Sequence, residues 1–236
     1  MIETVPQTGS TNADLAARLR TGERVAEGNW LVADRQTGGK GRQGRQWFDG
    51  AGNFMGSTLV RPGPGDPPAH TLALLAGLAV VETCLPHCPD PSALKLKWPN
   101  DAMVGRAKLA GILLEAARDG VIVGIGVNLA AAPRIEGRDA IALSDFGPAP
   151  DRDTFATSLA RAFDTELERW RTYGLEPLIR RWLAVAWPQG TAITVHDAGG
   201  ETLAGTFAGL ENTGSMRLRL DDGSIRAIHA GDVMLA

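Results

Sequence analysis

The spacing of apolar residues along the chain predicts four helices. Ser10, Thr11 and Asn12 come directly before an apolar stripe that stops at Gly22, as expected for a capped helix. Between residues 71 and 85 almost every position is apolar, which is typical of a helix buried on all sides. The predicted helices cover residues 10–22, 71–85, 153–174 and about 176–187.

Shorter apolar runs predict strands between these helices. Residues 94–98 alternate between apolar side chains and lysines, the pattern of a half-buried strand, and Pro99 stops the strand. The sequence Arg-Asp-Gly at 118–120 separates two apolar runs, which predicts a hairpin. The predicted strands cover residues 30–33, 55–60, 94–98, 109–116 and 121–129.

The pattern changes after Pro188. Five short apolar segments follow, separated by turns rich in glycine and aspartate, and this spacing predicts a small β-barrel. We therefore expect an α+β protein with a mixed β-sheet and flanking helices over residues 1–188 and a small barrel over residues 189–236. The five segments are 191–195, 203–207, 215–220, 224–228 and 233–235.

Composition limits the class of protein. The 236 residues are 44% hydrophobic, enough to bury a large core. With 24 basic and 27 acidic residues the net charge is −3, which gives no overall attraction for nucleic acid. The apolar run 72–81 ends at Glu82, too short to span a bilayer, and no secretory signal pattern opens the chain. We expect a cytoplasmic protein without a membrane partner.

The two cysteines and four histidines indicate no redox or metal chemistry. Cys84 and Cys88 lie on an apolar stretch and are too few for a disulfide framework. The histidines are scattered along the chain and form no metal-binding motif. A buried thiol pair in a reducing compartment is the expected state.

The segment Gly38–Trp47 carries the strongest chemical signal. It holds four glycines, the cations Lys40, Arg42 and Arg45, and a terminal indole. Glycine lets the backbone approach a ligand, and cations with loop N–H groups attract anions. The segment could hold a carboxylate beside a phosphate; a solvated basic loop is the plainer alternative.

The same segment also matches the sequence pattern of a dinucleotide-binding site, but without the structural context that such a site needs. Gly39, Gly41 and Gly44 match G-x-G-x-x-G, which requires a helix to begin at the third glycine. The residues after Gly44 have no helical apolar spacing and include two more glycines. We therefore do not expect a Rossmann site.

Polar groups at three predicted strand ends are further candidates. Asn100 and Asp101 follow a strand that must stop, where Asp could hold Mg²⁺ against phosphate oxygens, or where the pair simply forms a turn. Lys108 precedes a buried strand and could reach a carboxylate or phosphate, or extend into water. The glycines in 124–126 permit close approach of a ligand, and Asn128 offers an amide or merely ends the strand.

Taken together, these segments resemble the biotin protein ligase family, over essentially the whole chain. The resemblance implies a catalytic domain of the biotin/lipoate ligase type, similar to class II aminoacyl-tRNA synthetases, and an SH3-like C-terminal domain. The segments that carry it are 10–12, 39–47, 97–101, 108–115 and 124–128.

The chain departs from the family pattern at two positions. Lys40 stands where the family usually has arginine, and Gly9 stands where a carboxylate often precedes Ser-Thr-Asn. The chain also begins almost directly at the catalytic region, so we expect no helix-turn-helix, no DNA binding and no repressor activity.

The resemblance implies that the protein joins biotin to ATP and passes biotin to a lysine of a biotin carboxyl carrier domain. Lys108 and Arg42 would act at the reacting carboxylate and phosphate, and Asp101 would hold Mg²⁺ or accept a proton. The implied biotin-binding residues are Ser10, Thr11, Asn12, Gln36, Gly39, Lys40, Gly41, Arg42, Lys108 and Gly111. The implied ATP-binding residues are Arg42, Arg45, Trp47, Asn100, Asp101, Lys108 and Asn128.

Two alternatives stay open on the sequence. A lipoate or octanoate ligase of the same fold would not need a polar pocket for a ureido ring. A nucleic-acid-binding module would place Arg42, Arg45 and Trp47 on phosphates and a stacked base, with steep salt dependence. The sequence is compatible with a monomer or a homodimer.

Overall fold

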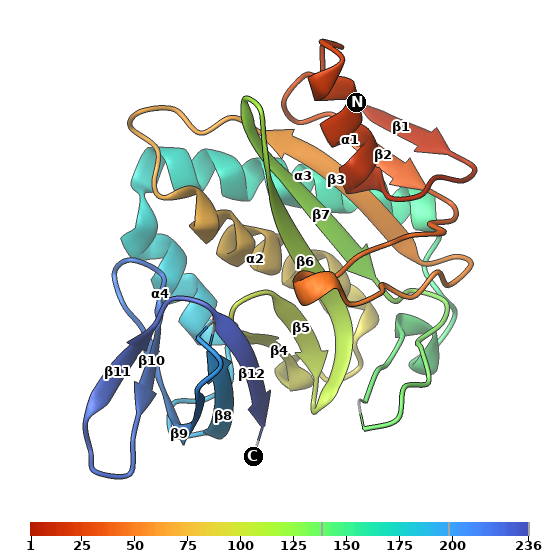
Figure 1. Cartoon of the computed structure of the whole chain (residues 1–236). Helices are drawn as coiled ribbons and strands as arrows, with labels where there is room; N and C mark the ends of the chain where they lie inside the picture. The colour runs from red at the N-terminus through yellow and green to blue at the C-terminus, as the bar shows by residue number, and fades with distance from the viewer. Residues whose placement is uncertain (138, 198, 236) are drawn as a thin grey trace.

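A computed structural model describes residues 1–137, 139–197 and 199–235, and its main feature is a seven-stranded mixed sheet (Figure 1). The strand order is β1-β2-β3-β7-β6-β5-β4, with β1 and β2 parallel and the other neighbours antiparallel. The mixed sheet predicted from the sequence is confirmed. Its strands are β1 (Ile2–Val5), β2 (Trp30–Ala33), β3 (Phe54–Val60), β4 (Leu94–Lys97), β5 (Asp101–Val104), β6 (Ala107–Ala117) and β7 (Gly120–Val127).

Helices cover both faces of this sheet. The helices α2 (Leu72–Cys84) and α3 (Arg152–Tyr173) lie behind the sheet in Figure 1, and α4 (Leu175–Val185) follows α3 along the chain. On the opposite face, α1 (Thr11–Arg20) packs Leu15 and Leu19 against a small cluster that includes Leu59 and Ile122. Their neighbours along the strands face the larger core, because successive strand side chains point to opposite faces.

The helix α2 is the centre of the larger core, and with 3₁₀ turns at both ends its helical stretch covers Ala69–His87. By length and composition this stretch could cross a membrane, because it is longer than the apolar run 72–81 on which the sequence-based prediction rested. However, 72% of its apolar window is buried inside the fold, as in the core helix of a soluble protein.

The described residues contain no cluster of three or more metal-ligating side chains. Cys84 and Cys88 are free thiols and both are buried. Burial raises the pKa of each thiol, and the neighbouring Cys88 adds to the shift at Cys84. Protonated, inaccessible thiols are poor nucleophiles, which agrees with a packing role.

A second sheet begins after α4. Its five strands are antiparallel in the order β11-β10-β9-β8-β12, at the lower left of Figure 1. The turn at Gly214 attaches it to the first sheet, because the Trp98 indole N–H donates to the Gly214 carbonyl at 3.1 Å. The strands are β8 (Ala192–Asp197), β9 (Thr202–Leu210), β10 (Met216–Arg219), β11 (Ile225–Ile228) and β12 (Gly231–Leu235).

Two strands were not predicted from the sequence. The edge strand β1 is short and its polar residues Glu3 and Thr4 are exposed, so its pattern carries little apolar signal. The strand β5 follows Pro99, where the sequence predicted the end of a strand but no new strand. The chain reverses at residues 98–100 and then pairs back on β4, which places Asp101 opposite Lys97.

Candidate active site

A pocket of about 590 Å³ lies on the face of the sheet that carries α1, between the glycine-rich loop and strands β6 and β7. This volume suits a small organic ligand. Gly39 does not line the pocket; a Cβ there would meet Gln36 Nε2 at 3.0 Å and Trp47 Cβ at 3.3 Å. All other predicted site residues line it: Ser10, Thr11, Asn12, Gln36, Lys40, Gly41, Arg42, Arg45, Trp47, Asn100, Asp101, Lys108, Gly111 and Asn128.

Glycines of β6 and β7 form the floor of the pocket. A Cβ at Gly126 would lie 2.3 Å from an indole carbon of Trp47, and one at Gly124 would lie 2.3 Å from Asn12 Oδ1. No real Cβ tolerates such distances, so only glycine lets these side chains lie on the strand backbone. The close approach expected at these glycines is thus made by side chains of the protein itself, which form the layer next to the cavity.

The glycine-rich loop folds back on itself as a narrow hairpin. Lys40 and Gln46 form an isolated antiparallel bridge, and the Gly41 N–H donates to the Arg45 carbonyl at 2.7 Å. At its tip is a single 3₁₀ turn, Arg42–Gly44, in which Gln43 takes a left-handed conformation with φ of 58°. The absence of an α-helix after Gly44 agrees with the rejection of a Rossmann site.

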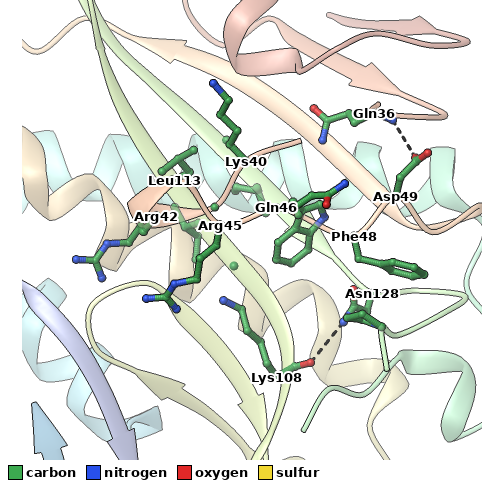
Figure 2. A pocket seen from close by; sticks show the side chains of 18 of the residues that line it. Gln36, Lys40, Arg42, Arg45, Gln46, Phe48, Asp49, Lys108, Leu113 and Asn128 are labelled. Atoms are coloured by element: carbon green, nitrogen blue, oxygen red, sulfur yellow. Dashed lines mark hydrogen bonds between the residues drawn. The ribbon is translucent and has the colours of Figure 1, made fainter. Parts of the chain in front are cut away.

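Arg42, Arg45 and Lys108 point toward one region of the pocket, while Gln36 lies at its other end (Figure 2). Arg42 donates to Asn100 Oδ1 at 3.2 Å, and burial lowers the pKa of its guanidinium against the opposing charge of Asp101. Arginine still keeps its charge at neutral pH. This end of the pocket is therefore suited to anions.

Arg45 reaches across to the second sheet. Its guanidinium forms an ion pair with Asp232 of β12, whose side chain also lines the pocket. The two residues are far apart in sequence, so the sequence offered no sign of this pair. The C-terminal sheet thus contributes a carboxylate to the site.

Asp101 is held between two lysines. Its carboxylate lies 2.6 Å from Lys108 Nζ and 2.9 Å from Lys97 Nζ, and the residue is 7% exposed. Burial by itself would raise the pKa of Asp101, but the charges of Lys108 and Lys97 outweigh it and hold the pKa below its ordinary value. Each oxygen already accepts from one lysine, so a metal ion or a proton at Asp101 would bind beside two positive charges that oppose it.

Five side chains at the other end of the pocket form a line of hydrogen bonds that we call the polar chain: Gln36, Thr11, Ser57, Asn12 and Glu115. Gln36 Oε1 accepts from the Thr11 N–H at 2.7 Å and from Thr11 Oγ1 at 3.0 Å. Ser57 Oγ lies 2.6 Å from both Thr11 Oγ1 and Asn12 Oδ1, and Asn12 Nδ2 donates to Glu115 Oε2 at 2.6 Å. Ser57 and Glu115 were not among the predicted site residues.

Asn128 follows the last residue of β7, and its amide makes hydrogen bonds within the protein through one of its two polar atoms. Its Nδ2 donates to the carbonyl of Ile141 at 3.1 Å and more weakly to that of Lys108 at 3.4 Å, the contact drawn in Figure 2. Its Oδ1 is buried and has no hydrogen-bond partner among the described residues. The side chain therefore ties two segments together and leaves one acceptor unused.

The segment after β7 was missed as part of the site. Five of its residues line the pocket: Pro133, Arg134, Ile135, Asp139 and Ala140. Asn53 holds the start of this segment, because its Oδ1 accepts from the N–H groups of residues 129, 130 and 131 at 2.9–3.0 Å. The sequence there has no apolar period that could have signalled a site.

Comparisons with known proteins agree on one family. A family model described as the biotin/lipoate A/B protein ligase family matches residues 5–129, and one described as the biotin protein ligase C terminal domain matches residues 190–235. The chain is 37% identical to a biotin--[acetyl-CoA-carboxylase] ligase of Mycobacterium tuberculosis, over 99% of this chain and 88% of that protein. It is also 37% identical to the ligase of the same name from Paracoccus denitrificans, over 90% of this chain and 92% of that protein.

The fold also matches that of a solved structure. The biotin protein ligase from Aquifex aeolicus, in complex with biotin and ATP, superposes with a TM-score of 0.87 at 26% identity. The match covers 100% of this chain and 99% of that chain. Both sheets are therefore part of the shared architecture.

Proposed function

This chain belongs to the biotin protein ligase family, and on that premise we propose how its pocket carries out the reaction of an ATP-dependent biotin protein ligase. In the first step a carboxylate oxygen of biotin bonds to the α-phosphorus of ATP and pyrophosphate leaves, giving biotinyl-5′-AMP. In the second step the amine of an acceptor lysine attacks the acyl carbon, and AMP leaves together with a proton. Biotin and ATP are the substrates.

The observation that most directly supports this function is that the two ends of the pocket differ in their chemistry. The polar chain offers amides and hydroxyls, the groups that a ureido ring requires. Arg42, Arg45 and Lys108 gather at the other end, where anions would be stabilised. We place the ureido ring of biotin at the polar chain and the phosphates of ATP at the cations.

Lys108 is the residue that we place at the reacting centre. Bringing a carboxylate to a phosphate joins two like charges, so preorganised cations are the main catalytic need. Biotin's carboxylate is ionised at neutral pH, and this step needs no general base. Lys108 would bridge the two anions, Asp101 would orient its ammonium group, and Arg42 would serve the same centre.

The nucleotide would lie along the loop and the segment after β7. Trp47 gives an apolar ring surface next to the cations, with Lys108 Nζ 5.7 Å from its ring centroid. Asp232 would hold the Arg45 guanidinium in place while its other N–H groups donate to phosphate. Asn100 would position phosphates, and the unused Oδ1 of Asn128 would accept from adenosine. The backbone around Lys40 and Gly41 would close over biotin.

Magnesium fits best as a companion of ATP. The described residues form no metal cluster, and both oxygens of Asp101 are paired with lysines. Mg²⁺ is usually bound through substrate phosphates with one or two carboxylates. The predicted role of Asp101 as a magnesium ligand stays a prediction, in which the ion would lie near Lys97 and Lys108.

The second step needs a carrier protein. The relatives are named as ligases of acetyl-CoA carboxylase, so we propose a biotin carboxyl carrier domain of a carboxylase as the partner, in the cytoplasm. We propose no DNA or membrane partner. The charges of Lys108 and Lys97 lower the pKa of Asp101, which opposes its service as proton acceptor.

The function is tested by ATP–pyrophosphate exchange with biotin, lipoate and octanoate as the acid. We expect exchange that depends on biotin and is far weaker with the other two acids, which cannot use the polar chain. Exchange with lipoate or octanoate at the rate seen with biotin would favour the alternative ligase.

A further inference from the structure

The contacts of the polar chain fix the orientation of the amide group at each end. Gln36 Oε1 accepts from the Thr11 backbone N–H at 2.7 Å, and a backbone N–H can only donate. The Gln36 amide must therefore present its oxygen, not its nitrogen, to Thr11 Oγ1. One end of the chain is fixed as an acceptor.

Glu115 fixes the other end. Its carboxylate accepts from Asn12 Nδ2 at 2.6 Å, and a carboxylate cannot donate. The nitrogen of the Asn12 amide must face Glu115, so Asn12 Oδ1 faces Ser57, 2.6 Å from its hydroxyl. This end of the chain is an acceptor as well.

Three contacts join these two amide oxygens through the hydroxyls of Thr11 and Ser57. Each hydroxyl carries one proton, so only two of the three contacts can be hydrogen bonds. Thr11 is 3% exposed, Ser57 is 0% exposed and Asn12 is 4% exposed. Gln36 Oε1 already accepts from the Thr11 backbone N–H, so the two protons satisfy every acceptor when Thr11 donates to Ser57 and Ser57 donates to Asn12 Oδ1.

We propose that Glu115 is a positioning residue for substrate selection: it holds the Asn12 amide so that Oδ1 accepts an N–H from the head group of the bound acid. Asn12 Oδ1 then accepts from Ser57 and from the ligand, which the two lone pairs of an amide oxygen allow. A cyclic urea carries such N–H groups, whereas an alkyl or dithiolane head carries none. This proposal rests on the proposed placement of biotin at the polar chain.

The geometry supports an action through Asn12. Asn12 lines the pocket, whereas Glu115 does not and is exposed on the far part of β6. Gly124 leaves room for the Asn12 oxygen, since a Cβ there would lie 2.3 Å from it. Glu115 thus sets the direction of the amide without contacting the substrate.

Replacing Glu115 tests the mechanism. In Glu115→Ala the Asn12 amide is free to turn, so that Nδ2 can face Ser57 and the ligand in place of the acceptor Oδ1. We expect the biotin Kd by calorimetry and the biotin KM to rise about tenfold, with the ATP KM and the kcat at saturating biotin unchanged. In Glu115→Gln the amide oxygen can still accept from Asn12, so we expect a clearly smaller rise.

A matched control removes another carboxylate from the same hairpin. Asp119 pairs with Arg61 at 2.9 Å in the turn between β6 and β7 and does not line the pocket. We expect Asp119→Ala to leave the biotin Kd unchanged. The thermal midpoints of all three variants show whether a change in Kd accompanies a general loss of stability.

Biotin analogues test the N–H itself. We expect the analogue in which a ring oxygen replaces the N–H facing Asn12 to bind much more weakly than biotin to the unsubstituted protein, and to lose most of that penalty in Glu115→Ala. The regioisomer serves as comparison. An unchanged biotin Kd in Glu115→Ala would overturn the proposal. Parallel rises in the biotin KM and the ATP KM would also overturn it. Absence of biotin-dependent exchange in the unsubstituted protein would instead count against the assigned reaction.

Discussion

At the scale of single residues, Lys108 joins several parts of the site through its side chain and its backbone. Its ammonium pairs with Asp101 at 2.6 Å and lies near the Trp47 ring, while its backbone bonds to residues 139 and 141 of the segment after β7. The side chain is 36% exposed, so its charge is available to a ligand. It combines a fixed position with a free cationic end.

The Lys108→Ala variant should therefore lose adenylation more than stability. Removing one preorganised cation from a reacting centre typically costs about 3 kcal/mol of barrier, on the order of a hundredfold in kcat of pyrophosphate exchange. Lys97→Ala is the comparison, because Lys97 pairs with the same carboxylate but does not line the pocket, and a smaller loss is expected. Near-normal exchange by a folded Lys108→Ala protein would remove Lys108 from the reacting centre.

Asp101 makes a prediction about pH. Its pKa is lowered in the folded protein, so its ion pairs add stability above the pKa of the unfolded chain, and this contribution disappears as pH falls through the lowered folded value. Asp101→Asn should reduce the free energy of unfolding at pH 7 by on the order of 3 kcal/mol, since two lysines lose their partner. The difference from the unsubstituted protein in urea titrations should shrink well below pH 4. A difference that is constant from pH 7 to pH 3 would contradict this account.

At the scale of elements, the contact between the glycine-rich loop and β12 couples the two sheets at the site. Asp232 holds the Arg45 guanidinium, and the loop otherwise bonds mainly to itself and to Asn100. Because the pair is partly exposed, its energy is modest. Its value lies in the position that it gives the loop.

Asp232→Ala should therefore raise the ATP KM about threefold to fivefold while leaving the biotin KM nearly unchanged. The matched control is Asp222→Ala, since Asp222 caps a turn between β10 and β11 and bonds only locally to Ser224 in the described structure. Steady-state exchange kinetics with each substrate varied in turn separate the two constants. Equal rises in both constants, or none, would show that the Asp232 pair does not position the nucleotide side.

The element scale also shows where sequence reasoning succeeds. Continuous apolar runs predicted the buried helix α2 and the β6–β7 hairpin, because such runs must be covered in any fold of this chain. The edge strand β1 and the strand β5 were missed, because their pairing depends on neighbours rather than on their own pattern. The loop after β7 was missed for a similar reason, since bonds to residues distant in sequence, such as Asn53 and those of strand β6, give it a defined place.

At the scale of the whole molecule, all but one of the site residues predicted from the sequence line the pocket, but few of the contacts between them were predicted. Motif residues such as Lys108 and Asp101 could be predicted because their chemistry is tied to a local sequence. The partners Asp232, Ser57 and Glu115 could not, because they meet the motif residues only after the sheet and the C-terminal strands have assembled. Those contacts decide which atoms point into the pocket, so they control specificity more than the presence of the reaction.

The central claim is that one pocket holds the ureido ring at the polar chain and the reacting phosphate at Lys108. A crystal structure with a stable analogue of biotinyl-5′-AMP, in which the acyl phosphate is replaced by a non-reactive ester, tests it most directly. We predict a ureido N–H within hydrogen-bond distance of Asn12 Oδ1, and a phosphate oxygen within hydrogen-bond distance of Lys108 Nζ. An analogue bound in the opposite direction, or with its phosphate away from Lys108, would contradict the account.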